Sequence, residues 1–189
     1  MDFKKGFTLV ELIIGFGLIG LVSVLVASLY FTNFRLFSNQ STSIDINSQN
    51  KIAVDEIVNE ARQSQGVAES CCLPTETTTS TVLVLQLWPL DANGDPFDPS
   101  GNYDYIIYKA DPDDSTRIQK KVVADASSTR PASTQILATA LAPDGLQFTY
   151  DNGTPSLAAK VTVSVSTTGT AAGKTQTVTQ TGSATLRNK

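Results

Sequence analysis

The stretch KKGFTLVELIIGFGLIGLVSVLVASLYF, residues 4–31, decides the fold of this 189-residue chain. Two lysines and a glycine precede about two dozen nearly unbroken apolar residues. An α-helix rises about 1.5 Å per residue, so a helix of this length crosses a hydrocarbon layer of about 30 Å. The two lysines fit a cytoplasmic amino end, because positive residues favour that side. The stretch therefore predicts one membrane-spanning helix, with the rest of the chain outside the cytoplasm.

Glu11 is the one charged residue inside this apolar stretch. A carboxylate at the centre of a membrane helix costs about 2.5–3.5 kcal/mol on insertion scales, so such an acid indicates a function. The small residue Gly6 precedes the apolar region, whereas the cleavage site of a secretory signal follows it. A plain single-pass anchor would account for the length and the lysines. It would not account for an acid five residues after Lys-Lys-Gly.

The order Lys4, Lys5, Gly6 and the run GFTLVELI resemble the class III signal of the type IV filament proteins. These proteins are the type IV pilins and the type II secretion pseudopilins. The resemblance implies that prepilin peptidase cuts between Gly6 and Phe7 and methylates the new amino group of Phe7. It also implies that Glu11, the fifth mature residue, pairs with the amino terminus of a neighbouring subunit. The implied partners are the peptidase/methyltransferase, other pilins or pseudopilins, the inner-membrane assembly platform and membrane lipid.

The composition argues against two other classes of protein. The formal net charge is −4, and removal of the leader MDFKKG (1–6) leaves −5. An acidic domain is a poor partner for nucleic acid, which requires clustered Lys and Arg, so none is expected. The basic run of Arg117, Lys120 and Lys121 is predicted to lie on a solvated strand face. The chain has no histidine, which removes the commonest general base and metal ligand, so no enzyme is expected.

The helix is predicted to continue past the membrane as an amphipathic segment, residues 32–66. No proline occurs before Pro74, and no glycine occurs between Gly20 and Gly66, which is a plausible stop. The segment 38–49 is rich in poor helix formers and is where a bend or fray would be expected. Apolar residues at three- and four-residue spacings predict one packed face: Phe34, Phe37, Ile44, Ile52, Ile57, Val58 and Ala61.

Three glycines inside the apolar half, Gly15, Gly17 and Gly20, leave two interpretations open. Small residues allow close helix packing in the membrane. Glycine also weakens a helix interior and could allow local unwinding on assembly. The proline that many major pilins carry further along is replaced here by Ser28, which argues against pronounced unwinding.

Residues 67–189 are predicted to form a β-rich extracytoplasmic domain. Seven runs of β-branched and aromatic residues alternate with turn signals: 81–88, 102–110, 116–125, 133–141, 145–151, 158–168 and 175–187. The Thr/Ser-rich stretch 166–183 is predicted to be an exposed hairpin. The expected fold class is α+β and pilin-like: one long N-terminal helix, membrane-spanning in its first half (7–31), packed on a mostly antiparallel sheet.

The only two cysteines, Cys71 and Cys72, are adjacent in a segment (67–81) predicted to be a polar loop. Disulfides persist outside the cytoplasm. Free thiols, a vicinal disulfide and bonds between subunits are all open, and free thiols are favoured. No metal site is expected here, because further ligands are lacking nearby.

Asp91, Asn93 and Asp95 alternate like the first three ligands of a calcium loop. The usual glycine and the bidentate acid at the twelfth position are missing, although Asp98 or Asp104 could supply a ligand. A solvated hairpin connection is the favoured interpretation. We therefore expect no cofactor, with calcium as the weaker alternative.

The C-terminal order of GLQFTYD, a β-branched strand, a Thr-rich hairpin and LRNK is similar to minor members of the filament family. These are the J-type pseudopilins and W-type minor pilins. The resemblance implies a structural subunit that assembles into, primes or caps a type IV pilus or secretion pseudopilus. The alternatives are a filament-displayed binding module (an adhesin or DNA-uptake competence pilin) and the major pilin. The expected location is the inner membrane, and a surface filament or periplasmic pseudopilus after assembly.

Overall fold

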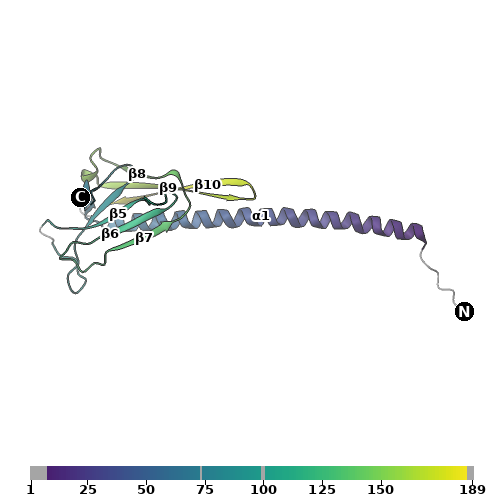
Figure 1. Cartoon of the computed structure of the whole chain (residues 1–189). Helices are drawn as coiled ribbons and strands as arrows, with labels where there is room; N and C mark the ends of the chain where they lie inside the picture. The colour runs from purple at the N-terminus through teal and green to yellow at the C-terminus, as the bar shows by residue number, and fades with distance from the viewer. Residues whose placement is uncertain (1–7, 73, 99–100, 187–189) are drawn as a thin grey trace.

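The computed structural model describes residues 8–72, 74–98 and 101–186. One long helix, α1 (Leu9–Gln63), leads into a β-rich domain and projects from it as a rod toward the N-terminus (Figure 1). At 55 residues, α1 is about 80 Å long. The expected α+β, pilin-like layout is confirmed. The leader residues Lys4, Lys5 and Gly6, and Phe7, the residue expected to become the amino terminus, lie outside the described residues.

Both ends of α1 have defined caps. At the start, the Thr8 hydroxyl accepts a hydrogen bond from the Glu11 amide while the Glu11 carboxylate accepts one from the Thr8 amide. At the end, the Ser64 amide donates to the carbonyls of Glu60 and Ala61. The predicted stop at Gly66 is wrong by three residues. The chain leaves the helix earlier because the Gln65 amide already donates to Gln86 in the sheet.

Two antiparallel sheets form most of the domain. The first has the order β1-β4-β5-β6-β7, and the second has the order β10-β9-β8. The first comprises β1 (Gly66–Val67), β4 (Leu83–Leu87), β5 (Asp104–Ala110), β6 (Ile118–Val123) and β7 (Ser133–Ala138). The second comprises β8 (Leu141–Tyr150), β9 (Lys160–Ala171) and β10 (Lys174–Thr185).

Each of the seven segments predicted to form a strand overlaps an observed strand, although β8, β9 and β10 extend beyond the predicted segments. The segment 67–81 is not the plain loop that was expected. It carries a small hairpin of β2 (Ser70–Cys71) and β3 (Glu76–Thr77). A short 3-10 helix, η1 (Pro155–Leu157), precedes β9.

The core lies between the second half of α1 and both sheets. Apolar helix residues from Ala53 to Ala61 pack with strand residues in one continuous cluster, which includes Leu83, Ile106, Phe148 and Val163. Glycines let the strands approach the helix closely. A Cβ added at Gly182 would stand 2.6 Å from Val54 Cγ1 and 2.8 Å from Val58 Cγ2. The domain is therefore seated directly on the helix.

The predicted packed face of α1 is wrong for four of its seven residues. Ile57, Val58 and Ala61 are buried, but large apolar side chains stay exposed: Phe34 (62%), Phe37 (70%), Ile44 (70%) and Ile52 (57%). The buried residues of the helix begin at Ile46 instead. At about 100° per residue, the four exposed residues all lie on the opposite side of the helix from Ile46. We call these four the outer stripe.

The segment 38–49 does not end or fray the helix, which continues through it. Contacts with the domain compensate for its poor helix formers. The side-chain oxygen Oε1 of Gln49 accepts the Thr139 amide at 2.9 Å, and the Thr167 hydroxyl donates to the backbone carbonyl of Ile46 at 3.0 Å. The side-chain Nδ2 of Asn50 donates to the Val178 carbonyl at 2.9 Å. Tertiary contacts thus override weak local propensity.

Candidate functional site

The first half of α1 has the properties of a membrane span. This helix is long and apolar enough to cross a membrane, and its most apolar stretch is not buried against the domain. The helix continues through Gly15, Gly17 and Gly20, where an added Cβ would meet nothing within 4 Å. Because glycine has no side chain, the helix backbone is accessible at these positions, and another helix could pack closely against it.

Glu11 lies at the start of this span, where its carboxylate is hydrogen-bonded to Thr8 at the helix N-terminus. Its Oε2 accepts hydrogen bonds from the Thr8 amide and the Thr8 hydroxyl, each at 2.9 Å. A negative charge here also faces the positive end of the helix dipole. Glu11 and Gly15 line a shallow, mostly apolar hollow of about 270 Å³ with Leu12, Phe16 and Ile19. The carboxylate is therefore oriented and accessible beside an apolar surface that could receive a second helix.

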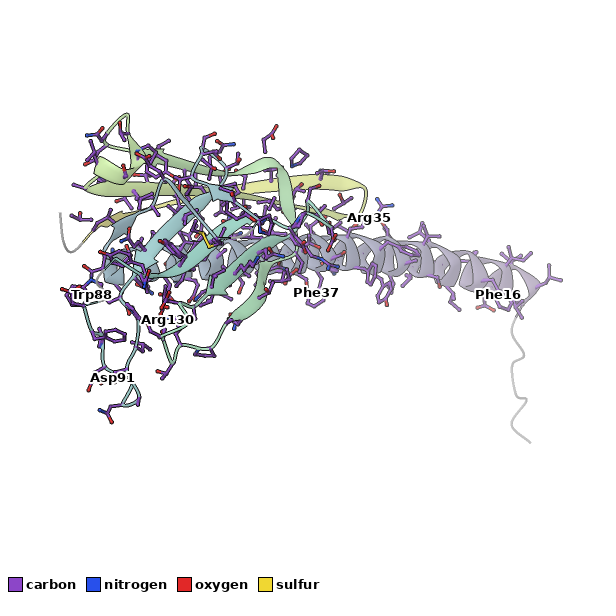
Figure 2. The ribbon with its side chains drawn as sticks, turned by 60° about the vertical axis from the view of Figure 1, so that its left-hand side comes forward. Phe16, Arg35, Phe37, Trp88, Asp91 and Arg130 are labelled. Atoms are coloured by element: carbon purple, nitrogen blue, oxygen red, sulfur yellow. A yellow bond between two sulfur atoms is a disulfide. The ribbon has the colours of Figure 1, made fainter. Side chains whose placement is uncertain are left out.

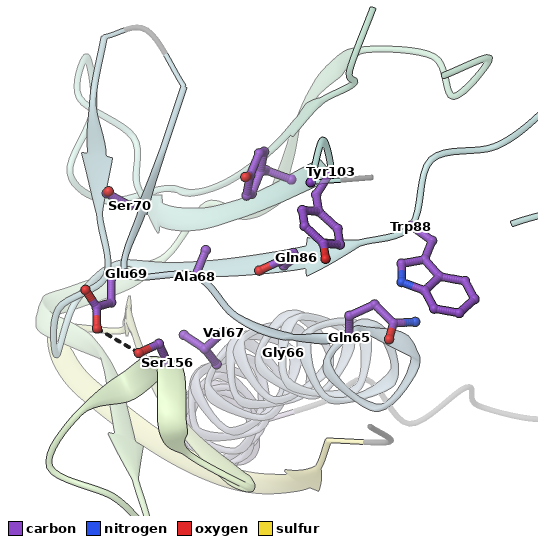
Figure 3. Close-up of a pocket in the computed structure, with 12 residues that line it drawn as sticks. Gln65, Gly66, Val67, Ala68, Glu69, Ser70, Gln86, Trp88, Tyr103 and Ser156 are labelled. Atoms are coloured by element: carbon purple, nitrogen blue, oxygen red, sulfur yellow. Dashed lines mark hydrogen bonds between the residues drawn. The ribbon is translucent and has the colours of Figure 1, made fainter. Parts of the chain in front are cut away.

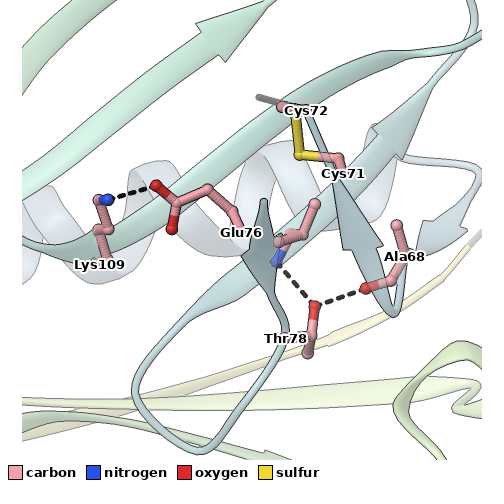
Figure 4. The surroundings of a disulfide bond; sticks show 7 residues. Ala68, Cys71, Cys72, Glu76, Thr78 and Lys109 are labelled. Atoms are coloured by element: carbon pink, nitrogen blue, oxygen red, sulfur yellow. Dashed lines mark hydrogen bonds and ion pairs between the residues drawn. A yellow bond between two sulfur atoms is a disulfide. The ribbon is translucent and has the colours of Figure 1, made fainter. Parts of the chain in front are cut away.

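Cys71 and Cys72 are joined in a disulfide, one of the three states left open and not the favoured one (Figure 4). Cys71 is buried against Ala68, Val84 and Ile107, which form a second apolar cluster. The Thr78 hydroxyl holds this hairpin in place, because it donates to the Ala68 carbonyl and accepts the Val84 amide. The bonded pair therefore lies at the end of β2 in a packed hairpin, and because its two residues are adjacent it does not link β2 to β3.

The Asp91 loop is organised by its own backbone. Asp91 Oδ1 accepts the amides of Asn93 at 2.8 Å and Asp95 at 2.9 Å. These hydrogen bonds hold the pKa of Asp91 below its usual value. Among the described residues, no three His, Cys, Asp or Glu side chains are grouped to hold a metal. The geometry gives Asp91 the role of a turn cap, and calcium binding stays an untested prediction.

Asp104, considered above as a further calcium ligand, is buried at the start of β5. It accepts the Asp125 amide at 2.8 Å, the Ser128 hydroxyl at 2.7 Å and Arg130 Nε at 2.8 Å. Arg130 Nη2 in turn donates to the Trp88 carbonyl at 3.3 Å. Asp104 therefore ties the loop after β6 to the ends of β4 and β5.

Lys120 is not on a solvated face, so that prediction is wrong. Its side chain is 9% exposed and donates to Glu56 at 2.6 Å and Glu60 at 2.8 Å, both on α1. Desolvation lowers the pKa of Lys120, but the two carboxylates raise it by more, so the net shift is upward. Glu56 and Glu60 are four residues apart and therefore lie on the same face of α1. Both carboxylates can therefore bind one lysine of the neighbouring strand.

Tyr108 is buried beside this triad, and its hydroxyl has no hydrogen-bond partner within the described part of the chain. Burial raises the pKa of Tyr108, as do the negative charges of Glu60 and Glu56. A buried hydroxyl without a partner costs about 1–3 kcal/mol. This site therefore carries a cost that phenylalanine would remove.

We expect Tyr108→Phe to raise the free energy of unfolding by about 1 kcal/mol at neutral pH. The raised pKa means that the folded state keeps a proton which the unfolded state loses above about pH 10, so the wild type loses stability as the pH rises further. The variant should lose less over that range. Urea unfolding at several pH values measures both effects, and a variant less stable than wild type at every pH would contradict this account.

A polar hollow of about 630 Å³ lies where the end of α1 meets the first sheet (Figure 3). Trp88, Tyr103 and Tyr105 line it, together with Gln86 and the segment 65–70. Glu69 accepts the Ser156 hydroxyl at its margin, at 2.7 Å. Trp88, 38% exposed, stands at the end of the molecule opposite Phe16 (Figure 2). Sequence reasoning missed this hollow because its residues come from separate segments, and only the exposed tryptophan hints at it.

Comparison with known families gives one match. The model of the prokaryotic N-terminal methylation motif matches residues 1–27, which include the leader and Glu11. Comparisons with curated proteins and with solved structures gave no match. The matched residues end within the apolar half of α1, so the type of subunit is not determined by them. The chain carries the N-terminal methylation motif that is the hallmark of type IV pilins and pseudopilins.

Proposed function

We propose that the protein is a minor pilin or pseudopilin, a structural subunit that prepilin peptidase cleaves and methylates. It then assembles into, primes or caps a type IV pilus or a type II secretion pseudopilus. The observation that carries this proposal is the exposed apolar surface of α1, which extends further than a membrane can cover.

A hydrocarbon layer of about 30 Å covers about 20 helical residues. In α1, exposed apolar side chains begin at Leu9, and the outer stripe extends to Ile52. Ile52 lies about 30 Å beyond Phe31, the last residue of the continuous apolar run. Lipid cannot reach that far, and the subunit's own domain covers the other side. Exposed apolar side chains that recur along one helix face, where lipid cannot cover them, favour a protein interface, and the helix of a neighbouring subunit has the right shape.

The lone acid supports the same assignment. Assembly moves the helix from lipid into an apolar bundle, where an unpaired carboxylate is costly. The free amine created at Phe7 by cleavage is the matching charge. Glu11 is already fixed in orientation by Thr8, so a neighbour's amine can approach a preorganised acceptor.

We expect Glu11→Ala to leave membrane insertion and cleavage intact and to lower incorporation into filaments at least tenfold. Quantitative mass spectrometry of sheared filaments and membranes measures the ratio. Glu11→Gln is the control, because it can still bond Thr8 but carries no charge. If Glu11→Gln behaves like Glu11→Ala, charge pairing matters, and if it behaves like wild type, capping matters. Normal incorporation of Glu11→Ala would sink the charge-pair idea.

The same fractions test the function itself. A peptide beginning at methylated Phe7, scarce beside one dominant pilin in sheared filaments, is the expected result for a minor pilus subunit. Methylated peptide confined to membranes would instead indicate a short pseudopilus. Abundance equal to that of the dominant species would make it the major pilin. An uncleaved N-terminus in every fraction would remove the filament proposal.

The hollow beside Trp88 favours a second candidate, a binding module displayed on a filament. It lies at the end of the molecule far from the membrane span, and aromatic side chains such as Trp88 and Tyr103 are common at recognition sites. If this candidate is right, Trp88→Ala combined with Tyr103→Ala will leave filament assembly unchanged and reduce attachment of filament-bearing cells to their natural surface.

A further inference from the structure

The hairpin formed by β9 and β10 extends beyond the rest of the domain and runs along α1 toward its apolar half (Figure 1). Its turn is tight, because Ala171 pairs with Lys174 and the two residues between them both have positive φ, 48° and 77°. Two contacts place this hairpin against the helix. A Cβ at Gly169 would stand 2.7 Å from Thr42, and Ala172 lines a hollow together with Phe31 and Arg35.

The hairpin turn therefore lies at the level of helix residues 31–38. The continuous apolar run ends at Phe31, and the polar residues Thr32 and Asn33 follow. This places the outer edge of the hydrocarbon near Phe31 when the helix spans a membrane. The headgroup layer adds about 5–8 Å on each side. Arg35 lies about 6 Å beyond Phe31 along the axis. The turn is thus at the depth of the lipid headgroups.

The charges at this level differ from those of the domain. Arg35 is the only charged residue in 32–44, and Lys174 is the only one in 161–186, in a chain whose formal net charge is −4. Both side chains are exposed. Aromatic residues also gather here, since Tyr30, Phe31 and Phe34 are all exposed on the helix. Aromatic side chains near a membrane boundary and cations beside phosphate groups are typical of an interfacial contact.

We propose that the tip of the β9–β10 hairpin is a membrane-contact element that rests in the headgroup layer of the outer leaflet. Lys174 and Arg35 bind the phosphate groups of anionic lipids there. This inference rests on the proposed membrane anchoring of α1 before assembly. The hairpin is then a second membrane contact, in addition to the helix, and it fixes the rotation of the domain about the helix axis. It must leave the lipid when the subunit enters a filament.

The test uses the full chain reconstituted in vesicles. Trp88 is the only tryptophan, so Trp88→Phe gives a silent background for single reporters. Leu18→Trp reports on the span, Thr175→Trp on the hairpin tip, and Asn93→Trp on the exposed loop at the opposite end. Brominated lipids quench tryptophan that touches them. We expect quenching at Leu18→Trp and Thr175→Trp, with bromines near the headgroup most effective for Thr175→Trp, and none at Asn93→Trp.

Each other pattern overturns the proposal and identifies its cause. Quenching at Leu18→Trp without quenching at Thr175→Trp removes the hairpin contact and leaves the anchor in place. If Leu18→Trp is not quenched, both the membrane anchoring of α1 and the hairpin contact are contradicted. Equal quenching at Asn93→Trp and Thr175→Trp shows nonspecific adsorption of the domain.

A charge variant tests the lipid chemistry. Lys174→Glu in the Thr175→Trp background should reduce quenching at least twofold in vesicles that contain phosphatidylglycerol, and much less in phosphatidylcholine alone. Lys160→Glu is the matched control, because Lys160 is exposed at the opposite end of the same hairpin. An equal effect of both variants would contradict specific contact by the tip.

Discussion

Replacement of Asp104 by alanine should lower the free energy of unfolding by about 3 kcal/mol, because it removes one partner of a buried ion pair. The Asp104 side chain is fully buried and accepts hydrogen bonds from Asp125, Ser128 and Arg130. Its loss leaves the guanidinium of Arg130, only 22% exposed, without this carboxylate. It also leaves an amide and a hydroxyl without their acceptor. Urea unfolding in detergent, followed by the fluorescence of Trp88, measures the change.

Two controls separate the charge from the shape of Asp104. Asp104→Asn keeps the volume and one acceptor oxygen, so we expect a smaller loss than for alanine. Arg130→Ala tests the other partner, and the double variant should cost less than the sum of the two single variants. Additive losses would show that Asp104 and Arg130 do not stabilise each other.

Lys120→Ala is expected to lower the free energy of unfolding by about 2 kcal/mol. The full cost of breaking a buried pair is about 3–5 kcal/mol. We expect less here because Glu56 and Glu60 are 38% and 24% exposed, and water screens their repulsion. The variant leaves the carboxylates of Glu56 and Glu60 side by side on α1 without the cation of β6. The loss should shrink when salt is raised, since salt screens that repulsion.

Lys121→Ala is the matched control, because Lys121 is the next residue on β6 and lies on its other face. It should change stability by no more than about 0.5 kcal/mol. Combining Lys120→Met with Glu56→Gln and Glu60→Gln removes all three charges and should restore most of the loss. Equal effects of Lys120→Ala and Lys121→Ala would show that the helix–strand ion pairs do not stabilise the domain.

The features predicted correctly from the sequence are local ones. A run of apolar residues marks the span wherever the rest of the chain lies, and the alternation from Val161 to Val165 marks a half-buried strand in any sheet. The methylation motif is local in the same sense, so Glu11 could be identified without a structure.

The predictions that failed depend on which parts of the chain meet. The extracytoplasmic half of α1 carries apolar residues on two opposite faces, and periodicity alone does not tell which face the domain covers. Phe37 and Ile44 were assigned to the wrong one for that reason. The sequence places Lys120 on a solvated face and offers Asp104 only as a ligand in a solvated loop, because their partners lie far away in the sequence or on another element. The hollow at Trp88 could not be predicted from the sequence either, because the residues that line it come from separate segments.

Because the helix and the sheets share one core, the domain moves together with the helix as one rigid unit. The domain is fixed to α1 by the close contacts at Gly169 and Gly182 and by the ion pairs of Lys120, and the helix is continuous from Leu9 to Gln63. Because the domain is fixed to a continuous helix, a tilt of the span also tilts the domain. A tilt of about 20°, ordinary for membrane helices, swings the far end of a rod of about 80 Å sideways by about 27 Å. Small changes of tilt within the bilayer thus move the domain over a wide distance, while its rotation about the helix axis stays fixed by the hairpin.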